Sequence, residues 1–160
     1  ELLLGNIVNT NAAFLAEQCA ALGLSCYYQT VVGDNPERLL QTVRTAFSRS
    51  DIILLSGGLG PTKDDLTKET VAEVFGAALL EDTASREMIA AYFQTRGKIP
   101  TENNWKQALV PEGGRAVANR NGTAPGIIME KEGRHVILLP GPPDELKPMF
   151  TEEAAKAGKF

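Results

Sequence analysis

The sequence predicts one α/β domain over residues 1–160, a three-layer α/β/α sandwich around a mixed, mostly parallel sheet with one antiparallel strand. Apolar runs alternate with amphipathic helical stretches, which favours βαβ units and parallel strands. The apolar stretch 125–141 is interrupted at Glu132-Gly133, which is typical of a β-hairpin and adds the antiparallel strand. A length of 160 residues suits a single hydrophobic core.

The N-terminal part predicts a strand end, a helix and a second strand. The opening ELLLG is the expected end of a first strand whose beginning is missing from this numbering. Leu15, Cys19 and Leu22 then recur at helical spacing, and Gly23 is the expected helix stop. Residues 24–34 are rich in aromatic and β-branched side chains, so they predict the next strand.

The middle of the chain continues this alternation. Asn35 is the expected N-cap of a helix that begins at the following proline. The apolar run 51–56 predicts a strand covered on both faces. A glycine-rich turn then leads into a helix over 68–75, with Thr67 as its candidate N-cap and Gly76 at its end.

The C-terminal half predicts three more helices around the hairpin. Residues 83–97 form an amphipathic pattern, and the less regular stretch 100–113 includes a short helix. A final helix begins at 142, directly after the hairpin.

Composition narrows the classes of partner. A net charge of −4 provides no basic field, so neither nucleic acid nor an anionic membrane is expected as a partner. No apolar run approaches the ~20 residues of a membrane span. Cys19 and Cys26 fit no metal-binding spacing and are expected to be buried, in a reducing, cytoplasmic compartment.

The stretch SGGLGPTKDDLT, residues 56–67, is the main candidate site. Gly57, Gly58 and Gly60 follow a predicted parallel strand, where α/β folds bind ligands. Glycines turn tightly and bring N–H groups close to an anion. The pattern matches neither GxGxxG nor the P-loop. A plain strand-to-helix turn also explains the glycines, so both interpretations stay open.

Two adjacent aspartates favour a ligand site over a plain turn. Asp64 and Asp65 precede a helix, whose dipole stabilises negative charge at its start. One carboxylate is enough for that purpose, so the other is expected to face a ligand or a divalent cation. Lys63 is a candidate phosphate partner, and Pro61 and Thr62 belong to the same predicted substrate-binding loop.

Neighbouring strand ends carry further polar candidates. Asp34 ends the predicted strand 24–34 and would reach the same rim, although a turn before Asn35 explains it equally. The first strand end carries Glu1 and the polar side chains Asn6, Asn9 and Asn11. Such convergence suits a metal-assisted phosphate site, and the residues alone leave open which of these carboxylates would hold the metal.

Two later stretches complete the predicted pocket. Pro140 and Gly141 end the last apolar run and would form a rigid wall. Hydrogen bonds to a base or a ribose are expected from Asn103, Asn104, Lys106 and Gln107, although a solvated helix face is the alternative. The single histidine, His135, lies in a strand pattern without partner spacing, which argues against a catalytic triad.

Six blocks run in order through nearly the whole chain: GNIVNTNAAFLAEQCAALG, QTVVGDNPERL, SGGLGPTKDDLTKETVAE, ENNWKQA, GTAPG and LLPGPPDELKPMF. Together they resemble the N-terminal domain of the bacterial CinA proteins, the competence/damage-inducible family. This resemblance implies the fold of the MoaB/MogA proteins of molybdenum-cofactor biosynthesis and a homo-oligomer. Many members also carry a C-terminal domain that deamidates nicotinamide mononucleotide, no part of which falls within residues 1–160.

The resemblance also implies an activity and its residues. The family's GG-x-G…D loop falls on Gly57, Gly58, Gly60 and Asp65, its second aspartate falls on Asp34, and its G-x-E motif survives as Glu1. The activity implied is a hydrolysis of ADP-ribose to AMP and ribose 5-phosphate that depends on a divalent metal, Mg²⁺ or Co²⁺. The predicted catalytic residues are Asp65, Asp34 and Asp64, and the metal ligands that the resemblance implies are Asp65 and Glu1.

Two other functions stay open. Related cofactor-synthesis proteins use the same loop for molybdopterin, so a molybdopterin-binding or adenylyl-transferring domain is the first alternative. A non-catalytic assembly module is the second. The expected ligand is therefore a small nucleotide, ADP-ribose, or a pterin.

Overall fold

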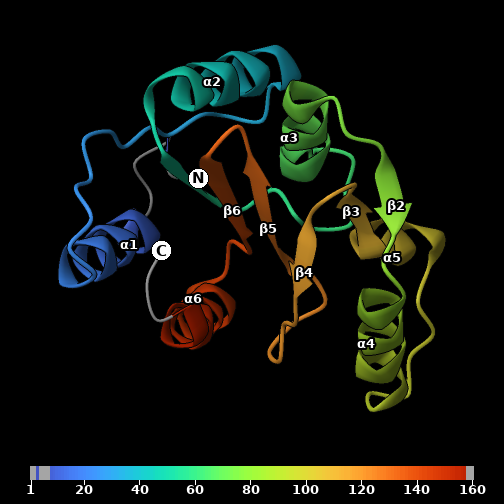
Figure 1. Ribbon diagram of the computed structural model, residues 1–160. Helices are drawn as coiled ribbons and strands as arrows, with labels where there is room; N and C mark the ends of the chain where they lie inside the picture. The colour runs from blue at the N-terminus through green and yellow to red at the C-terminus, as the bar shows by residue number, and fades with distance from the viewer. Residues whose placement is uncertain (1–2, 4–7, 158–160) are drawn as a thin grey trace.

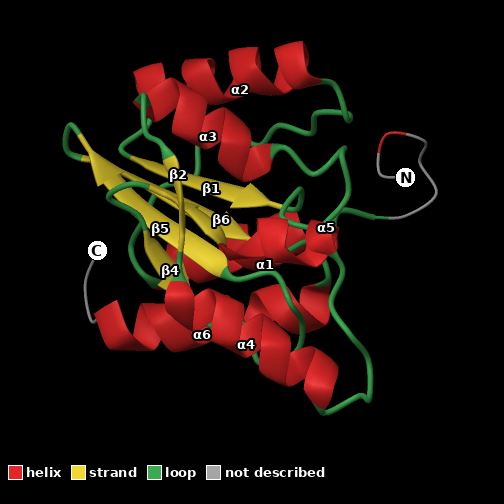
Figure 2. Ribbon diagram, turned by 90° about the vertical axis from the view of Figure 1, so that its right-hand side faces the viewer, coloured by secondary structure: helices red, strands yellow, loops and turns green. Residues whose placement is uncertain are grey.

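The computed structural model describes residues 3 and 8–157 of the 160-residue chain. The helices are α1 (Thr10–Ala21), α2 (Pro36–Arg49), α3 (Thr67–Phe75), α4 (Thr83–Gln94), α5 (Glu102–Trp105), the 3₁₀ helix η2 (Lys106–Ala108) and α6 (Pro143–Ala157). The strands are β1 (Ile52–Ser56), β2 (Leu79–Glu81), β3 (Leu109–Pro111), β4 (Arg115–Val117), β5 (Gly126–Lys131) and β6 (Arg134–Leu139). Helices α2 and α3 cover one face of the main sheet, and α1 and α6 cover the other (Figures 1 and 2).

The main sheet has the strand order β1-β6-β5-β4. Strand β1 runs parallel to β6, whereas β5 is antiparallel to both of its neighbours. Strands β1, β6 and β4 therefore share one direction and β5 is the antiparallel strand, which confirms the predicted fold class. Strands β2 and β3 form a separate antiparallel pair beside α4 and α5 (Figure 1).

Strand β6 divides the core into two layers, because successive side chains point to opposite faces of a strand. Val136 and Leu138 join the cluster between the sheet and helices α2 and α3. Ile137 and Leu139 join the cluster under α1 and α6. The hairpin turn is confirmed at Glu132-Gly133, where both residues have the positive φ, 54° and 73°, that a two-residue turn requires.

Most predicted helix ends are confirmed. The Asn35 side chain caps α2 by accepting from the N–H of Arg38 at 2.9 Å. Gly76 ends α3 in the left-handed conformation. The prediction for Thr67 is wrong, because Leu66 holds the N-cap position and makes no side-chain cap. The Thr67 hydroxyl is used elsewhere, as a donor to the carbonyl oxygen of Gly57.

The predicted strand over 24–34 is absent. These residues carry no strand assignment, and Tyr27, Tyr28 and Val31 expose 82%, 56% and 43% of their surface. A strand is held by backbone hydrogen bonds to a neighbour. None of the described strands pairs with this segment. High strand propensity alone therefore leaves the segment extended and exposed.

The two cysteines differ in burial. Cys19 lies buried in α1, and burial raises the pKa of its thiol. Cys26 is exposed in the unpaired segment, so the expectation of burial was wrong for this residue. In the part of the chain that the structure describes, no helix is long and apolar enough to cross a membrane.

Candidate functional site

The loop between β1 and α3, residues 57–66, is termed the glycine loop. It begins where the parallel strands β1 and β6 end side by side. The N–H of Gly57, the first residue of the loop, donates to the carbonyl oxygen of Leu139, the last residue of β6, at 2.9 Å. The loop therefore lies at the carboxyl edge of a parallel strand pair, where backbone groups are released from the sheet.

Asn11 connects helix α1 to this edge. Its Nδ2 atom donates to Ser56 Oγ at 3.0 Å and to the carbonyl oxygen of Gly141 at 2.7 Å. Its Oδ1 atom is buried and has no hydrogen-bond partner among the described residues. Asn9, another predicted ligand residue, instead caps α1 by accepting from the N–H of Ala12. Of these two asparagines, Asn11 is the one with a buried amide oxygen that lacks a partner among the described residues.

Three successive carbonyl oxygens of the glycine loop are bound by neighbouring elements. The Gly57 oxygen accepts from Thr67 Oγ1 at 2.8 Å, and the Gly58 oxygen accepts from the Thr67 N–H at 3.1 Å. The Leu59 oxygen accepts from Gln107 Nε2 at 3.3 Å. In a planar trans peptide the following N–H points opposite to the carbonyl. The N–H groups of residues 58–60 therefore point away from these partners, and none makes a hydrogen bond within the described chain.

Packing inside the chain explains why two loop positions are glycine. Gly57 and Gly58 have φ of 93° and 69°, in the left-handed region. A Cβ on Gly58 would lie 2.1 Å from Thr67 Oγ1, and a Cβ on Gly60 would lie 2.6 Å from Asp65 Oδ2. The glycines at 58 and 60 are thus required by the loop itself, and their presence alone is no evidence for a ligand.

Asp65 shapes the second half of the glycine loop. Its Oδ2 atom accepts from the N–H of Thr62 at 2.9 Å and from Thr62 Oγ1 at 2.5 Å. Its Oδ1 atom accepts no hydrogen bond among the described residues and remains available. The side chains of Lys63 and Asp64 are exposed, and Pro61 is half-buried. The structure thus distinguishes Asp65 from Asp64 by its contacts.

Two lysines lie beneath the loop and bind backbone oxygens. Lys106 Nζ donates to the carbonyl oxygens of Asp65 at 2.9 Å and Thr62 at 3.3 Å, and it pairs with Glu69 Oε1 at 3.3 Å. Lys68 Nζ donates to the carbonyl oxygen of Lys106. Burial lowers the pKa of Lys68 to about 8.

The sequence analysis did not identify Lys68, and it considered Gln107 only as a candidate ligand contact. Lys68 shares a helix face with Val71, Ala72 and Phe75, which are buried. A lysine at an apolar position of a helix was therefore the available signal. The contact of Gln107 with Leu59 carried no comparable signal, because the stretch around Gln107 has no clear periodicity.

Other predicted site residues have local roles or lie elsewhere. Asn104 Oδ1 accepts from the N–H and hydroxyl of Thr101, which forms the capping box of α5. Asp34 is exposed before Asn35 and makes no hydrogen bond or ion pair with a described residue. Pro140 is buried next to Gly141. Glu1 and Asn6 lie outside the described residues.

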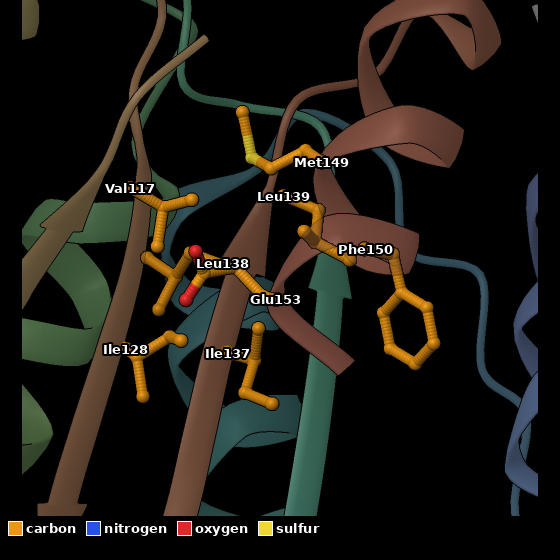
Figure 3. A pocket seen from close by; sticks show the side chains of 8 residues that line it. All are labelled: Val117, Ile128, Ile137, Leu138, Leu139, Met149, Phe150 and Glu153. Carbon is orange, nitrogen blue, oxygen red and sulfur yellow. The ribbon is translucent and has the colours of Figure 1, made fainter. Parts of the chain in front are cut away.

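A small cavity between the sheet and α6 is a poor alternative site (Figure 3). Apolar side chains from β4, β5, β6 and α6 line it, together with Glu153. The Glu153 carboxylate already pairs with Arg115 at 2.7 Å. An anion would meet apolar walls and a negative charge there, so the glycine loop remains the candidate site.

The comparisons with known proteins agree with this fold. A family model described as a probable molybdopterin binding domain matches residues 1–157. A putative competence-damage inducible protein from a Thermoanaerobacter species is 55% identical over 152 residues, which are 95% of this chain and 37% of that relative. The chain thus spans well under half of that curated relative.

Solved structures give the same result. The protein CinA from Thermoplasma acidophilum, described as of unknown function, is 35% identical with a TM-score of 0.90, covering 100% of this chain and 94% of that one. The molybdopterin biosynthesis Mog protein from Mycobacterium ulcerans covers 98% of this chain and 88% of its own, with a TM-score of 0.62. At 17% identity, that second likeness shows the fold alone. The chain belongs to the molybdopterin-binding-domain family and, within it, to the CinA-type competence-damage inducible proteins.

Proposed function

We propose that the glycine loop binds the phosphate group of a small molecule, and that molybdopterin, which the family description names, represents its ligand class. The observation that carries the proposal is that the three N–H groups of residues 58–60 point away from the donors that bind the preceding carbonyls and make no hydrogen bond within the described chain. Their partial positive charges add to that of the α3 N-terminus, because the first residue of α3 is bonded to the same loop.

Asn11 supports a ligand with hydrogen-bond donors next to its phosphate. A buried amide oxygen without a partner costs free energy, on the order of 1–3 kcal/mol. A ligand N–H or O–H at this position would recover that cost. A pterin ring supplies such N–H groups, and a ribose supplies such hydroxyl groups.

Hydrolysis of the ADP-ribose diphosphate is the second candidate, and the unused Oδ1 of Asp65 favours it. This oxygen belongs to a carboxylate that is fixed against the loop by two hydrogen bonds from Thr62. A fixed carboxylate beside a phosphate site suits a divalent cation, which would polarise the phosphate oxygens and activate water when bound.

The described residues fit such a metal only in part. They contain no group of three or more His, Cys, Asp or Glu side chains that could hold an ion. Mg²⁺ is commonly held by one or two protein carboxylates together with substrate phosphates and water. Asp65 would therefore hold the metal only while the diphosphate is bound, and Mg²⁺ binding should depend on ADP-ribose.

Binding experiments separate the two ligand classes. Titration calorimetry would use neopterin monophosphate in one arm and ADP-ribose with Mg²⁺ in the other. Heat of binding in either arm supports the phosphate site, and AMP release in the second arm adds the hydrolase. Absence of binding in both arms would overturn the proposal.

The substitution Asp65→Asn tests the hydrolase directly. Asparagine keeps the shape of the side chain and removes its charge, so we expect AMP release to fall about 100-fold, as for loss of a metal-site group. Asp51→Asn is the matched control, because Asp51 is exposed just before β1, at the opposite end of that strand from the glycine loop. Equal rates for wild type and Asp65→Asn would remove Asp65 from the chemistry. Asp64→Asn and Asp34→Asn, measured in parallel, test the two other predicted catalytic aspartates.

A further inference from the structure

Two side chains of the 3₁₀ helix η2 donate hydrogen bonds to carbonyl oxygens of the glycine loop, although the helix and the loop are distant in sequence. Lys106 Nζ donates to the carbonyl oxygens of Thr62 and Asp65, and it pairs with Glu69. A lysine ammonium has three N–H donors. Two carbonyl oxygens accept hydrogen bonds from this ammonium and the Glu69 carboxylate pairs with it, so three oxygens of the chain lie around it. In this arrangement Lys106 supports the loop, which is a different role from the ligand contact that the sequence analysis predicted.

Gln107 holds the first half of the same loop. Its side chain is 2% exposed, and its Nε2 atom binds the carbonyl oxygen of Leu59. Because the Leu59–Gly60 peptide is planar and trans, this bond turns the Gly60 N–H to the opposite side. The Oε1 atom of Gln107 is buried without a partner among the described residues. An apolar side chain would avoid that unpaired oxygen, so the contact with Leu59 is what the glutamine provides.

Lys68 fixes η2 to the helix that follows the loop. Lys68 lies on the first turn of α3, and its buried ammonium donates to the carbonyl oxygen of Lys106 in η2. The glycine loop, α3 and η2 are thus joined in one closed set of contacts. Movement of η2 would release the Leu59 and Asp65 carbonyls together.

We infer that Lys106 and Gln107 are positioning residues of the phosphate site: they fix the loop carbonyls from beneath and so direct the N–H groups of residues 58–60 outward. The inference rests on the proposed function for its ligand, but the loop geometry it describes is measurable without one. Neither residue touches the ligand in this arrangement.

The ligand-free test follows the three loop amides by ¹⁵N–¹H NMR. Gln107→Leu fills the same space without a donor, so the Gly60 N–H should shift and exchange faster with solvent. Lys131→Met is the control, since Lys131 Nζ donates to the carbonyl oxygen of Phe75 at the far end of α3. Unchanged signals for residues 58–60 in both Gln107→Leu and Lys106→Met would overturn the inference, whether or not a ligand binds.

The binding test uses inorganic pyrophosphate and titration calorimetry, at a temperature where every variant is folded by circular dichroism. We expect Gln107→Leu and Lys106→Met to raise the dissociation constant about tenfold, equivalent to one lost hydrogen bond. Lys106→Arg keeps donors for the loop carbonyls and should restore most of the affinity, while Lys131→Met should leave it unchanged. Wild-type affinity in Gln107→Leu would overturn the inference, whereas no binding by the wild type would count against the proposed function alone.

Discussion

The glycine loop and the segment 24–34 both connect regular elements, yet their backbones are held very differently. In the loop, the carbonyl oxygens of Gly57, Gly58 and Leu59 each have a defined donor. In the segment, Tyr27 and Val31 are exposed and no strand pairing is formed. The loop has low strand and helix propensity but a fixed shape, whereas the segment has high strand propensity and no sheet partner. The loop has a fixed shape because residues distant in sequence bind its carbonyl oxygens, and segment 24–34 lacks such partners among the described strands.

The largest loss of stability is expected at Gly58, where the glycine loop packs directly against the Thr67 side chain. A methyl group in Gly58→Ala would collide with Thr67 Oγ1, and φ is 69°. Left-handed strain and overpacking together should lower the free energy of unfolding by about 3 kcal/mol. Urea denaturation measures this loss.

Gly23→Ala is the matched control for Gly58→Ala. Gly23 has φ of 77°, but a Cβ there has nothing within 4 Å. Backbone strain alone should then cost about 1 kcal/mol. Equal losses in the two variants would mean that Thr67 does not close tightly on the loop, and the comparison with segment 24–34 would lose its basis.

The second effect concerns the buried ammonium beneath the loop. Burial lowers the pKa of Lys68 from 10.5 to about 8, so between these values the unfolded chain binds more protons at Lys68 than the native state does. Stability contributed by Lys68 should therefore rise with pH across this window. Relative to Lys68→Met, the wild type should gain about 2 kcal/mol between about pH 7 and 9.5.

Urea denaturation of both proteins at the two pH values measures this gain. The titrating groups that do not interact with Lys68 are shared by the wild type and Lys68→Met, so their contributions cancel in the difference. A difference that stays constant with pH, or that falls, would show that Lys68 is solvated in solution. The hydrogen bond from Lys68 in α3 to the Lys106 carbonyl in η2 would then be weaker than the structure indicates.

Much of the fold followed from local pattern. The N-cap at Asn35, the turn at Glu132-Gly133 and the stop at Gly76 each depend on residues within a few positions, and all three were predictable. The strand over 24–34 was not, because propensity describes a residue's own preference and a sheet requires a neighbouring strand.

The candidate site also combines features that local sequence predicts with features that depend on distant residues. The position of the loop was predictable from the spacing of the glycines, whereas the choice of Asp65 over Asp64 came from the resemblance to the CinA family. The roles of Lys106 and Gln107 were not, because their partners lie 41 and 48 residues away in sequence. Asn104, predicted as a ligand contact, instead satisfies the start of its own short helix.

The smallest effect is expected in segment 24–34. Tyr27 is 82% exposed, so Tyr27→Ser should change the free energy of unfolding by no more than about 0.5 kcal/mol. Tyr28→Ser should cost slightly more, about 0.5–1 kcal/mol, because the Arg49 guanidinium lies 3.6 Å from the centre of the Tyr28 ring. Urea denaturation of both variants gives the two values. A loss of about 2 kcal/mol for Tyr27→Ser would mean that this ring is packed in solution, as it would be in a paired strand. The contrast between the glycine loop and segment 24–34 would then be lost, because contacts with neighbouring residues would hold both of them.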